Sequence, residues 1–452
     1  MRSSKTESLA YFVIAFILLL VIGLTVRDGG GQPHFLADIN HVLDGTHDMS
    51  DPGSFALGAK DIYLHGWFTA VNMWLIHLWP PGFMLLEGAI LKVFGPETPV
   101  VLILQILASA CLAAMMLLQR MLLKPMIGAL PASILPLSIL LLPVARQFLL
   151  EPLGVVLGET FSVSLFISSV TLVVLALQRR QVRWAIVGGI CLALAAYFRS
   201  QFELLVLAYT ALAIPLAAWL VIGLRGTRSD AQRTARRFML RAVIAFVITA
   251  QLLMLPWRIH NKIDAGSFRW VQTMDVVASN SLSTNQYLLE KNGGFVIEGG
   301  GDLSCKFEPS YCGKTDTHFF FSAFVRHFPE WEKVKISLAP KYWFSSLKNT
   351  GILRFPATKL DIVWNAILLI FTVAIVPLQI AIRRHSWSPL LLWINLSFFS
   401  PFFVVFSLVA FEARYFYLVK IFGFSMCMLL ACLTWTLQTS QRRGEIGVFS
   451  AK

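Results

Sequence analysis

The sequence has little charge for its length. Asp, Glu, Lys and Arg make up only 14% of the 452 residues, and 56% are hydrophobic. An average soluble protein carries about a quarter charged residues. No internal repeat of fixed period is visible, which argues against a helical solenoid. Instead, apolar runs recur that are long enough to cross the hydrocarbon core of a bilayer. The composition therefore predicts an all-α polytopic membrane protein.

A signal-peptidase cleavage site is also missing. Arg2 and Lys5 precede the first apolar run, as in a signal peptide. The residues that end this run, Thr25-Val-Arg-Asp, lack the small-x-small pattern that cleavage requires. We therefore predict that residues 1–26 are retained as an N-terminal transmembrane anchor.

Ten apolar runs predict membrane spans. They cover residues 9–26, 100–118, 126–142, 161–177, 184–198, 204–224, 239–255, 360–382, 389–410 and 415–437. Residues 83–94 are apolar but short, and residues 149–157 are ambiguous, so we expect about 10–12 transmembrane helices. Two large polar loops interrupt the spans. The predicted order is the anchor, a first outer loop (27–80), a transmembrane bundle (81–256), a large outer loop (257–359), C-terminal transmembrane helices (360–437) and a basic cytoplasmic tail (438–452).

The net charge of +13 is not arranged as a nucleic-acid surface would require. Residues 223–241 alone hold six arginines against one aspartate. Short basic turns between spans mark the cytoplasmic side of a membrane, so both large polar loops are expected outside, and no nucleic-acid partner is predicted. The basic turn 119–124 fits the cytoplasmic side by charge. Counting residues 83–94 as a full span would instead place that turn outside.

The six cysteines fall into two groups. Four lie in apolar spans, while Cys305 and Cys312 lie seven positions apart in the large polar loop. A disulfide between Cys305 and Cys312 would fit an oxidising compartment, and we predict that they pair. Spacing alone does not establish the geometry of the bridge, so two free thiols stay open as the alternative.

The first outer loop concentrates titratable groups. It holds six aspartates and five of the nine histidines. His34, Asp38 and His41 are spaced so that a helix would bring them to one face, and imidazole with carboxylate can hold a divalent metal. A solvated helix lying on the membrane surface is the favoured interpretation. The presence of a metal is therefore left open.

Several stretches together resemble the GT-C superfamily of membrane glycosyltransferases. The similarity is to the bacterial branch that resembles dolichyl-phosphate-mannose–protein mannosyltransferases and aminoarabinose transferases (family 39-like). The main stretches are Asp51-Pro-Gly-Ser-Phe, Ala59-Lys-Asp-Ile-Tyr-Leu-His-Gly-Trp-Phe, Trp79-Pro-Pro-Gly-Phe-Met-Leu-Leu and Val93-Phe-Gly. Weaker matches are Leu150-Glu-Pro-Leu, Tyr197-Phe-Arg, Leu255-Pro-Trp-Arg-Ile-His-Asn and Glu412-Ala-Arg-Tyr. The large outer loop departs from the pattern of oligosaccharyltransferases, because it is too short for their soluble domain.

The resemblance implies transfer of a sugar from a polyprenyl-phosphate donor to a glycan, lipid or protein acceptor, with inversion. It implies Asp51 as the base, although Asp51-Pro-Gly-Ser would also make an ordinary turn. Arg414 is the preferred phosphate ligand. The other candidate substrate-binding residues are Arg258, His260, Arg199, Glu151 and, if its turn lies outside, Lys124 with Arg120. The implied location is the bacterial inner membrane, with the site facing the periplasm.

Two other functions stay open. A polysaccharide polymerase or ligase would place its key Arg and His in the late outer loop. A lipid flippase or transporter would place ionisable residues at mid-membrane and repeat its two halves, whereas the titratable residues here gather in the first loop.

Overall fold

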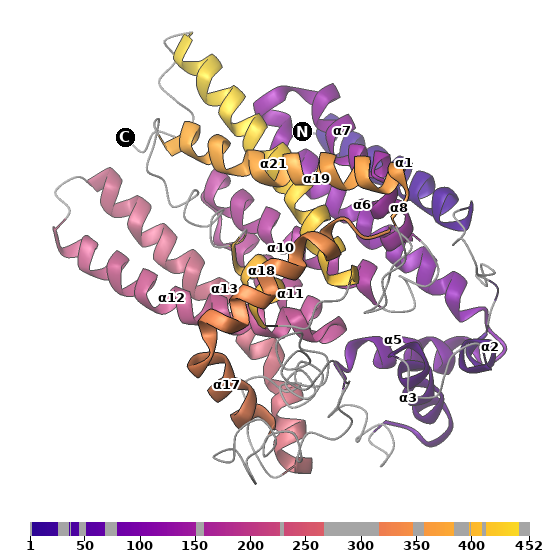
Figure 1. The fold of residues 1–452 in the computed structure, drawn as a ribbon. Coiled ribbons are helices and arrows are strands. Elements are labelled where there is room, and N and C mark those ends of the chain that lie inside the picture. Colours follow the sequence, from indigo (N-terminus) through magenta and orange to yellow (C-terminus); the bar gives the residue numbers. More distant parts are fainter. Residues whose placement is uncertain are drawn as a thin grey trace.

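The computed structural model describes residues 2–25, 36, 38–44, 51–67, 79–150, 158–226, 230–265, 316–346, 357–383, 397, 399–408 and 413–442. Over these ranges the chain is helical and contains no strand, which confirms the predicted all-α class (Figure 1). Seven of the described helices are long and apolar enough to cross a membrane. Two shorter apolar helices, Ala129–Leu141 and Val182–Phe198, add to them. The chain is an integral membrane protein with several spans.

Helix α1 (Arg2–Thr25) packs antiparallel to α6 (Val100–Ile127). The carboxylate of Glu7, near the start of α1, contacts Arg120 and Lys124 in the last turns of α6. At the other end of the pair, Gly23 lies directly against the side chain of Gln105. The two helices therefore run in opposite directions across the membrane, and α6 begins at the end where α1 finishes.

Helix α5 (Gly82–Phe94) does not cross the membrane. It has 13 residues and ends at Gly95, whose φ of 90° lies in the region that glycine adopts readily. It packs lengthwise on α3 (Asp51–His65), which follows the short helix α2 (Ile39–Asp44). Figure 1 shows α2, α3 and α5 grouped at the lower right of the bundle. We call α3 and α5 the platform, and the end of the bundle where they lie the platform end.

This placement resolves the conflict over the basic turn 119–124. Because α5 is not a span, one crossing separates the platform from Lys124, and Lys124 lies at the opposite end. The helix also runs further than the predicted span 100–118, since it continues to Ile127. Arg120 and Lys124 belong to this extended part of α6, where the carboxylate of Glu7 pairs with both of them.

The next crossing is assembled from three short elements: α7 (Ala129–Leu137), the 3₁₀ turn η1 (Ser138–Leu141) and α8 (Pro143–Leu150). Tyr11 of α1 donates to the carbonyl of Ser133 in α7 at 3.2 Å, close to the start of α1. The carbonyl of Leu150 lies beside Gly23, near the other end of α1. The chain thus returns to the platform end over these three pieces, further than the predicted span 126–142 reaches.

Four consecutive helices follow. They are α10 (Glu159–Arg179), α11 (Val182–Phe198), α12 (Ser200–Gly226) and α13 (Asp230–Ala265). Phe83 of the platform contacts Phe161 at the start of α10 and Phe198 at the end of α11. The turn between α10 and α11 therefore lies at the end of the bundle opposite the platform. The C-terminus of α12 and the N-terminus of α13 lie at that end too, and they project at the left of Figure 1. We call the end opposite the platform the arginine end.

The C-terminal part holds α17 (Asp316–Arg326), α18 (Phe328–Trp343), α19 (Lys359–Arg383), the π-helical turn η3 (Val404–Leu408) and α21 (Ala413–Arg442). Thr436 of α21 lies near the carbonyl of Met126 at 3.4 Å, so α21 ends at the arginine end. Gly423 packs closely on Thr372 of α19, and both helices start at the platform end. Of the predicted span 389–410, the structure describes only residue 397 and residues 399–408.

Candidate functional site

The platform is fastened to the bundle by aromatic rings. The ring of Phe55 in α3 lies 5.4 Å from that of Phe83 in α5. Phe83 in turn lies 6.1 Å from Phe161 and 6.3 Å from Phe198, and these two rings stack at 5.1 Å. Aromatic pairs at such distances add to the energy of apolar burial. Asp51, the first residue of α3, is one helical turn from Phe55, so the backbone of the predicted base starts near this contact.

The Pro-Pro-Gly turn has a steric reason. A Cβ on Gly82 would lie 2.6 Å from the carbonyl oxygen of Tyr197, closer than real Cβ atoms approach. The start of α5 can therefore lie against the end of α11 only with glycine at this position. This close approach brings the platform to the residues that follow Tyr197.

Arg199 occupies the break between α11 and α12. Its backbone is extended, with φ −148° and ψ 131°, and its side chain reaches the start of α10. There Arg199 Nη2 lies 2.7 Å from Glu159 Oε1, and both side chains are buried. A charge at this depth needs a partner of opposite sign, since losing water costs several kcal/mol per ion. The ion pair thus ties three helix ends together.

Arg258 forms a second buried centre beside the first. It lies on α13, and its Nη1 donates to Oε1 of Gln251, about two helical turns earlier on the same helix. Gln251 Nε2 donates to Thr210 Oγ1 on α12 at 2.5 Å. Glu203, also buried, lies near enough to stabilise the charge of Arg258. Two carboxylates and two guanidinium groups therefore occupy the platform end.

The neighbouring residues of the Pro-Trp-x-x-x-Asn motif also lie here. Trp257 packs on Tyr197 with ring centroids 5.6 Å apart, and Tyr197 donates to the carbonyl of Leu253 at 2.8 Å. His260 Nδ1 lies 3.1 Å from Oδ1 of the buried Asn261. Of the predicted substrate-binding residues, Arg199, Arg258 and His260 are thus gathered at the same end of the bundle.

Lys420 is a buried cation that the sequence analysis missed. It lies in α21, and its Nζ donates to the carbonyl of Trp343 and to Asn365 Oδ1, each at 2.8 Å. Asn365 donates to the carbonyl of Ser345 at 3.0 Å. The network joins α21 to the ends of α18 and α19. A lone lysine in the apolar run 415–437 was the available signal, because ionisable residues inside spans are rare and usually functional.

A second lysine is buried in the outer helix α18. Lys335 is 1% exposed, and burial lowers its pKa to about 7, although Glu332 opposes the shift. The indole N–H of Trp331, one turn earlier, donates to the carbonyl of Ser407 at 3.0 Å. Helix α18 is therefore held tightly against the segment that precedes α21.

One aromatic ring connects the arginine centres with the lysine centre. The ring of Phe166 on α10 lies 5.2 Å from Phe202 on α12 and 5.1 Å from Phe422 on α21. Phe202 follows Arg199 by three residues, and Phe422 follows Lys420 by two. The helix segments that carry Arg199 and Lys420 therefore pack on the same ring, that of Phe166.

Glu87 is a buried acid within the platform itself. It is fully buried, and neither carboxylate oxygen has a hydrogen-bond partner among the described residues. Burial raises its pKa well above the ordinary value, because a charged carboxylate loses its hydration there. The apolar run 83–94 hid this residue, because one acid hardly changes the average hydropathy.

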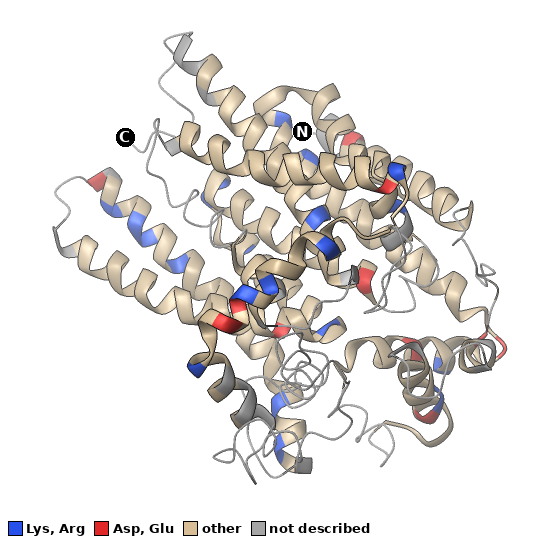
Figure 2. Cartoon of the chain, in the orientation of Figure 1, with Lys and Arg blue, Asp and Glu red and all other residues tan. Residues whose placement is uncertain are grey.

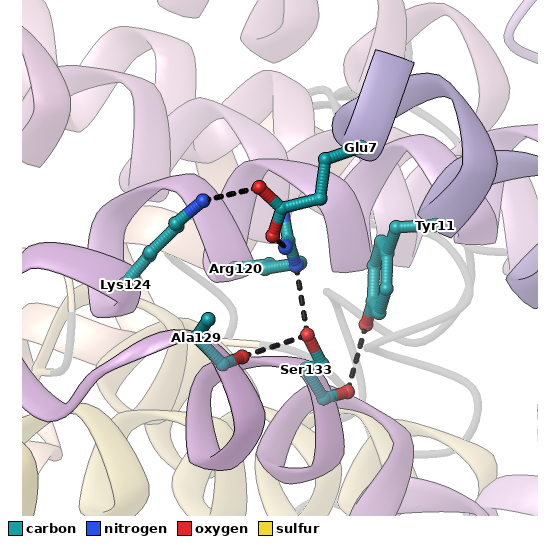
Figure 3. Close-up of polar contacts among 6 residues, drawn as sticks. All are labelled: Glu7, Tyr11, Arg120, Lys124, Ala129 and Ser133. Atoms are coloured by element: carbon teal, nitrogen blue, oxygen red, sulfur yellow. Dashed lines mark hydrogen bonds and ion pairs between the residues drawn. The ribbon is translucent and has the colours of Figure 1, made fainter. Parts of the chain in front are cut away.

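Lys124 is not brought together with these groups. At the arginine end its Nζ lies 2.6 Å from Glu7 Oε2 (Figure 3). The same carboxylate accepts from Arg120, whose Nε donates to Ser133 Oγ at 2.8 Å. Lys124 and Arg120 therefore fasten α6 to α1 and α7, a full crossing away from the platform.

Other predicted residues are only partly described or lie outside the described residues. Asp51, His41 and Arg414 are placed by their backbones alone, Arg414 in the first turn of α21. Glu151, His34, Cys305 and Cys312 lie outside the described residues, so the disulfide stays a prediction. Asp38 is half-buried, and its carbonyl accepts the Val42 N–H at 3.2 Å. Within the described ranges no three His, Cys, Asp or Glu side chains are grouped as a metal would require.

Comparison with known proteins gives a distant likeness. No protein-family model and no curated protein matches the chain. Among solved structures it is similar to the oligosaccharyltransferase of Archaeoglobus fulgidus in the apo form, with a TM-score of 0.46 and 14% identity, covering 98% of this chain and 52% of that one. It is also similar to the archaeal oligosaccharyltransferase AglB from Archaeoglobus fulgidus in complex with an inhibitory peptide and a dolichol-phosphate. There the TM-score is 0.43 and the identity 12%, again over 98% of this chain and 52% of that one. The chain spans about half the length of these structures, and the likeness is too distant to transfer a residue or a substrate.

Proposed function

We propose that this protein is an integral-membrane glycosyltransferase of the GT-C type. It takes a sugar from a polyprenyl-phosphate donor and passes it to a glycan, lipid or protein acceptor at the platform end. The observation that carries the proposal is the packing of α3 onto the bundle. Through Phe55 and Phe83, the helix that begins at Asp51 is held against the helix ends that carry Arg199 and Glu159.

The reaction is a single displacement. The acceptor hydroxyl forms a bond to the anomeric carbon while the bond from that carbon to the phosphate oxygen breaks. Asp51 takes the hydroxyl proton, and the phosphate leaves with the bonding electrons and a negative charge. A cation must stabilise that charge as it develops. One inversion at the anomeric carbon follows from the single step.

Arg414 is proposed as the phosphate ligand. It lies in the first turn of α21, immediately before the apolar span that begins at Tyr415, and the phosphate of a lipid donor is likewise expected at the end of the spans. Arg199 and Arg258 already have buried acidic or amide partners. We therefore assign them to holding the helix ends in place, and leave the donor to Arg414. His260 and Glu151 are proposed to shape the sugar pocket. No step is assigned to a metal.

The central test replaces the proposed base. Asp51→Asn keeps the helix start but cannot accept a proton, so turnover should fall by roughly a hundredfold or more. Asp44→Asn and Asp48→Asn, in the same loop, serve as matched controls and should be milder. The assay measures transfer of labelled sugar from polyprenyl phosphate to membrane acceptors, with donor binding measured separately. Full turnover in Asp51→Asn would reject the base assignment.

The pattern of losses also separates the alternatives. Arg414→Ala should weaken donor binding, whereas Asp51→Asn should leave it unchanged. A polymerase or ligase would lose activity on substitution of Arg258 and His260 while tolerating Asp51→Asn. Equal losses at Asp44, Asp48 and Asp51 would indicate a shared metal site instead.

The proposed location is the bacterial cytoplasmic membrane, with the platform end facing the periplasm. Two exposed positions report on the two ends: Lys92 on α5 and Arg237 on α13. In intact cells an impermeant thiol reagent should label Lys92→Cys and leave Arg237→Cys unlabelled until the membrane is permeabilised. The reverse pattern would overturn the orientation and exclude a periplasmic donor.

A further inference from the structure

A stripe along α13 carries arginines at one end and apolar side chains beyond them. Arg237 and Arg241 are exposed, one helical turn apart, near the start of the helix. Ile244, Ile248 and Leu252 continue the same face toward the platform end and are 43%, 50% and 60% exposed. The spacing i, i+4, i+7, i+11 and i+15 keeps all five side chains on one side of the helix.

The arginines of this stripe have no acidic partner. Arg237 and Arg241 make no ion pair with any described carboxylate, and the one pair nearby joins Arg233 to the exposed Asp230 at 4.0 Å. Between residues 160 and 263 the sequence contains only two acids, Glu203 and Asp230. Glu203 lies at the platform end. At the start of α13 the arginines therefore outnumber the one acid, Asp230 (Figure 2).

Two further arginines near this end of the bundle, Arg236 on α13 and Arg183 on α11, lie beside tryptophan rings. The guanidinium of Arg236 lies 5.7 Å from the ring centre of Trp219 on α12, and Gly223 leaves room for it. On α11 the guanidinium of Arg183 lies 5.4 Å from the centre of Trp184. Arginine and tryptophan together are typical of the zone where lipid headgroups meet the hydrocarbon core.

Helix α11 carries Arg183 at the level of Arg241, on the side of α13 that faces away from the stripe. The two helices run parallel, and Gly189 of α11 packs closely on the backbone of Phe246 in α13. Arg183 lies six residues before Gly189, and Arg241 lies five residues before Phe246. At about 1.5 Å of rise per residue, both arginines are displaced by a similar distance toward the arginine end.

We propose that this surface binds an anionic phospholipid of the leaflet at the arginine end. The headgroup phosphate accepts hydrogen bonds from Arg237 and Arg241, since guanidinium groups match phosphate oxygens. One acyl chain follows Ile244, Ile248 and Leu252 toward the middle of the membrane. The site is a full crossing away from Asp51 and is independent of the proposed function.

The test counts bound lipids on the purified full chain by native mass spectrometry in detergent. The probes are phosphatidylglycerol and, as the zwitterionic control, phosphatidylcholine. Each arginine near a membrane surface favours anionic lipid by about fivefold, so R237Q/R241Q should retain phosphatidylglycerol about twenty-five-fold more weakly than wild type. Raised salt should weaken the wild-type complex, because exposed charges are screened.

A matched variant controls for total charge. K333Q/K341Q removes two exposed cations from α18 and should retain phosphatidylglycerol as wild type does. Should the double arginine variant not accumulate, R241Q alone is measured, and a loss of about fivefold is expected. The proposal is overturned if the arginine variants keep phosphatidylglycerol as wild type does. It is also overturned if phosphatidylcholine binds equally well, or if inorganic phosphate alone displaces the lipid by filling the same site.

Discussion

The cationic side chains that we compare at the two ends of the bundle differ in burial and in their partners. At the platform end Arg199, Arg258 and Lys420 are 5%, 2% and 0% exposed, and each donates to a named acidic, amide or carbonyl oxygen. At the arginine end Arg237 and Arg241 are exposed and have no carboxylate within ion-pair distance among the described residues.

The difference follows burial and not the side of the membrane. Arg120 shows this, because it lies at the arginine end and is 3% exposed. Like Arg199, it has a carboxylate partner, in its case Glu7, and a further acceptor in Ser133. A guanidinium removed from water requires internal acceptors, whereas an exposed one keeps its water or takes a phosphate from a lipid. Buried cations therefore fix helix positions, and exposed ones are free to bind.

The largest effect is expected where a buried charge loses its partner. Glu159→Gln leaves the charge of Arg199 uncompensated, and the free energy of unfolding should fall by about 3–5 kcal/mol. Denaturant unfolding in detergent micelles measures this. Asp230→Asn, at the exposed pair with Arg233, is the matched control and should change stability by less than about 1 kcal/mol. Equal effects at the two sites would remove the contrast between the ends.

A smaller loss is expected on removing a neutral partner of a buried cation. Asn365→Leu keeps the side-chain volume but takes one acceptor from Lys420 and leaves the carbonyl of Ser345 without its donor. The free energy of unfolding should fall by about 2–3 kcal/mol. Gln232→Leu, on the exposed start of α13, should change it by less than about 0.5 kcal/mol. An unchanged Asn365→Leu protein would show that Lys420 is held by packing alone.

The buried Lys335 should make stability depend on pH. In the folded state its pKa is lowered to about 7 from the ordinary 10.5. Between these values the unfolded chain holds a proton that the folded chain has lost, so stability rises with pH. The slope for one proton is at most about 1.4 kcal/mol per pH unit. Lys335→Met should flatten the dependence over this window; identical slopes in the two proteins would contradict the assignment.

The smallest effect is expected at the arginine end. Arg237→Gln removes an exposed side chain that has no ion-pair partner in the described part of the chain. In lipid-free detergent the free energy of unfolding should therefore change by less than about 0.5 kcal/mol. Thermal unfolding with and without phosphatidylglycerol sharpens the comparison, since only the lipid-stabilised part should be lost. A large loss in lipid-free detergent would place Arg237 among the structural cations instead.

Much of the fold could be predicted from hydropathy. The long helices α1, α10, α12, α19 and α21 match predicted spans, because a run of apolar residues in a bilayer has to satisfy its backbone hydrogen bonds as a helix. The composition alone therefore determined the all-α class. The short segments were harder. The sequence could not decide whether residues 83–94 cross the membrane, since length and hydropathy leave a 13-residue helix undetermined.

Part of the candidate site could likewise be predicted from the sequence, and part could not. The types and approximate positions of Arg199, Arg258 and His260 followed from motifs, whereas the helix that starts at Asp51 is seen only in the structure. Their grouping at one end needed the fold. Glu159 and Lys420 passed unnoticed, because each stands alone within an apolar stretch and its partner is distant along the chain.

The sequence by itself determined which long apolar segments enter the membrane and which of the turns between them are basic. Both depend on the transfer free energy of individual side chains between water and lipid, a property of residues taken one at a time. Only the tertiary structure decided that Arg199 meets Glu159, that Lys420 meets Asn365, and that Arg237 meets no acid among the described residues. Those outcomes depend on which helix ends lie side by side, and helix packing is set by contacts between residues far apart in the chain.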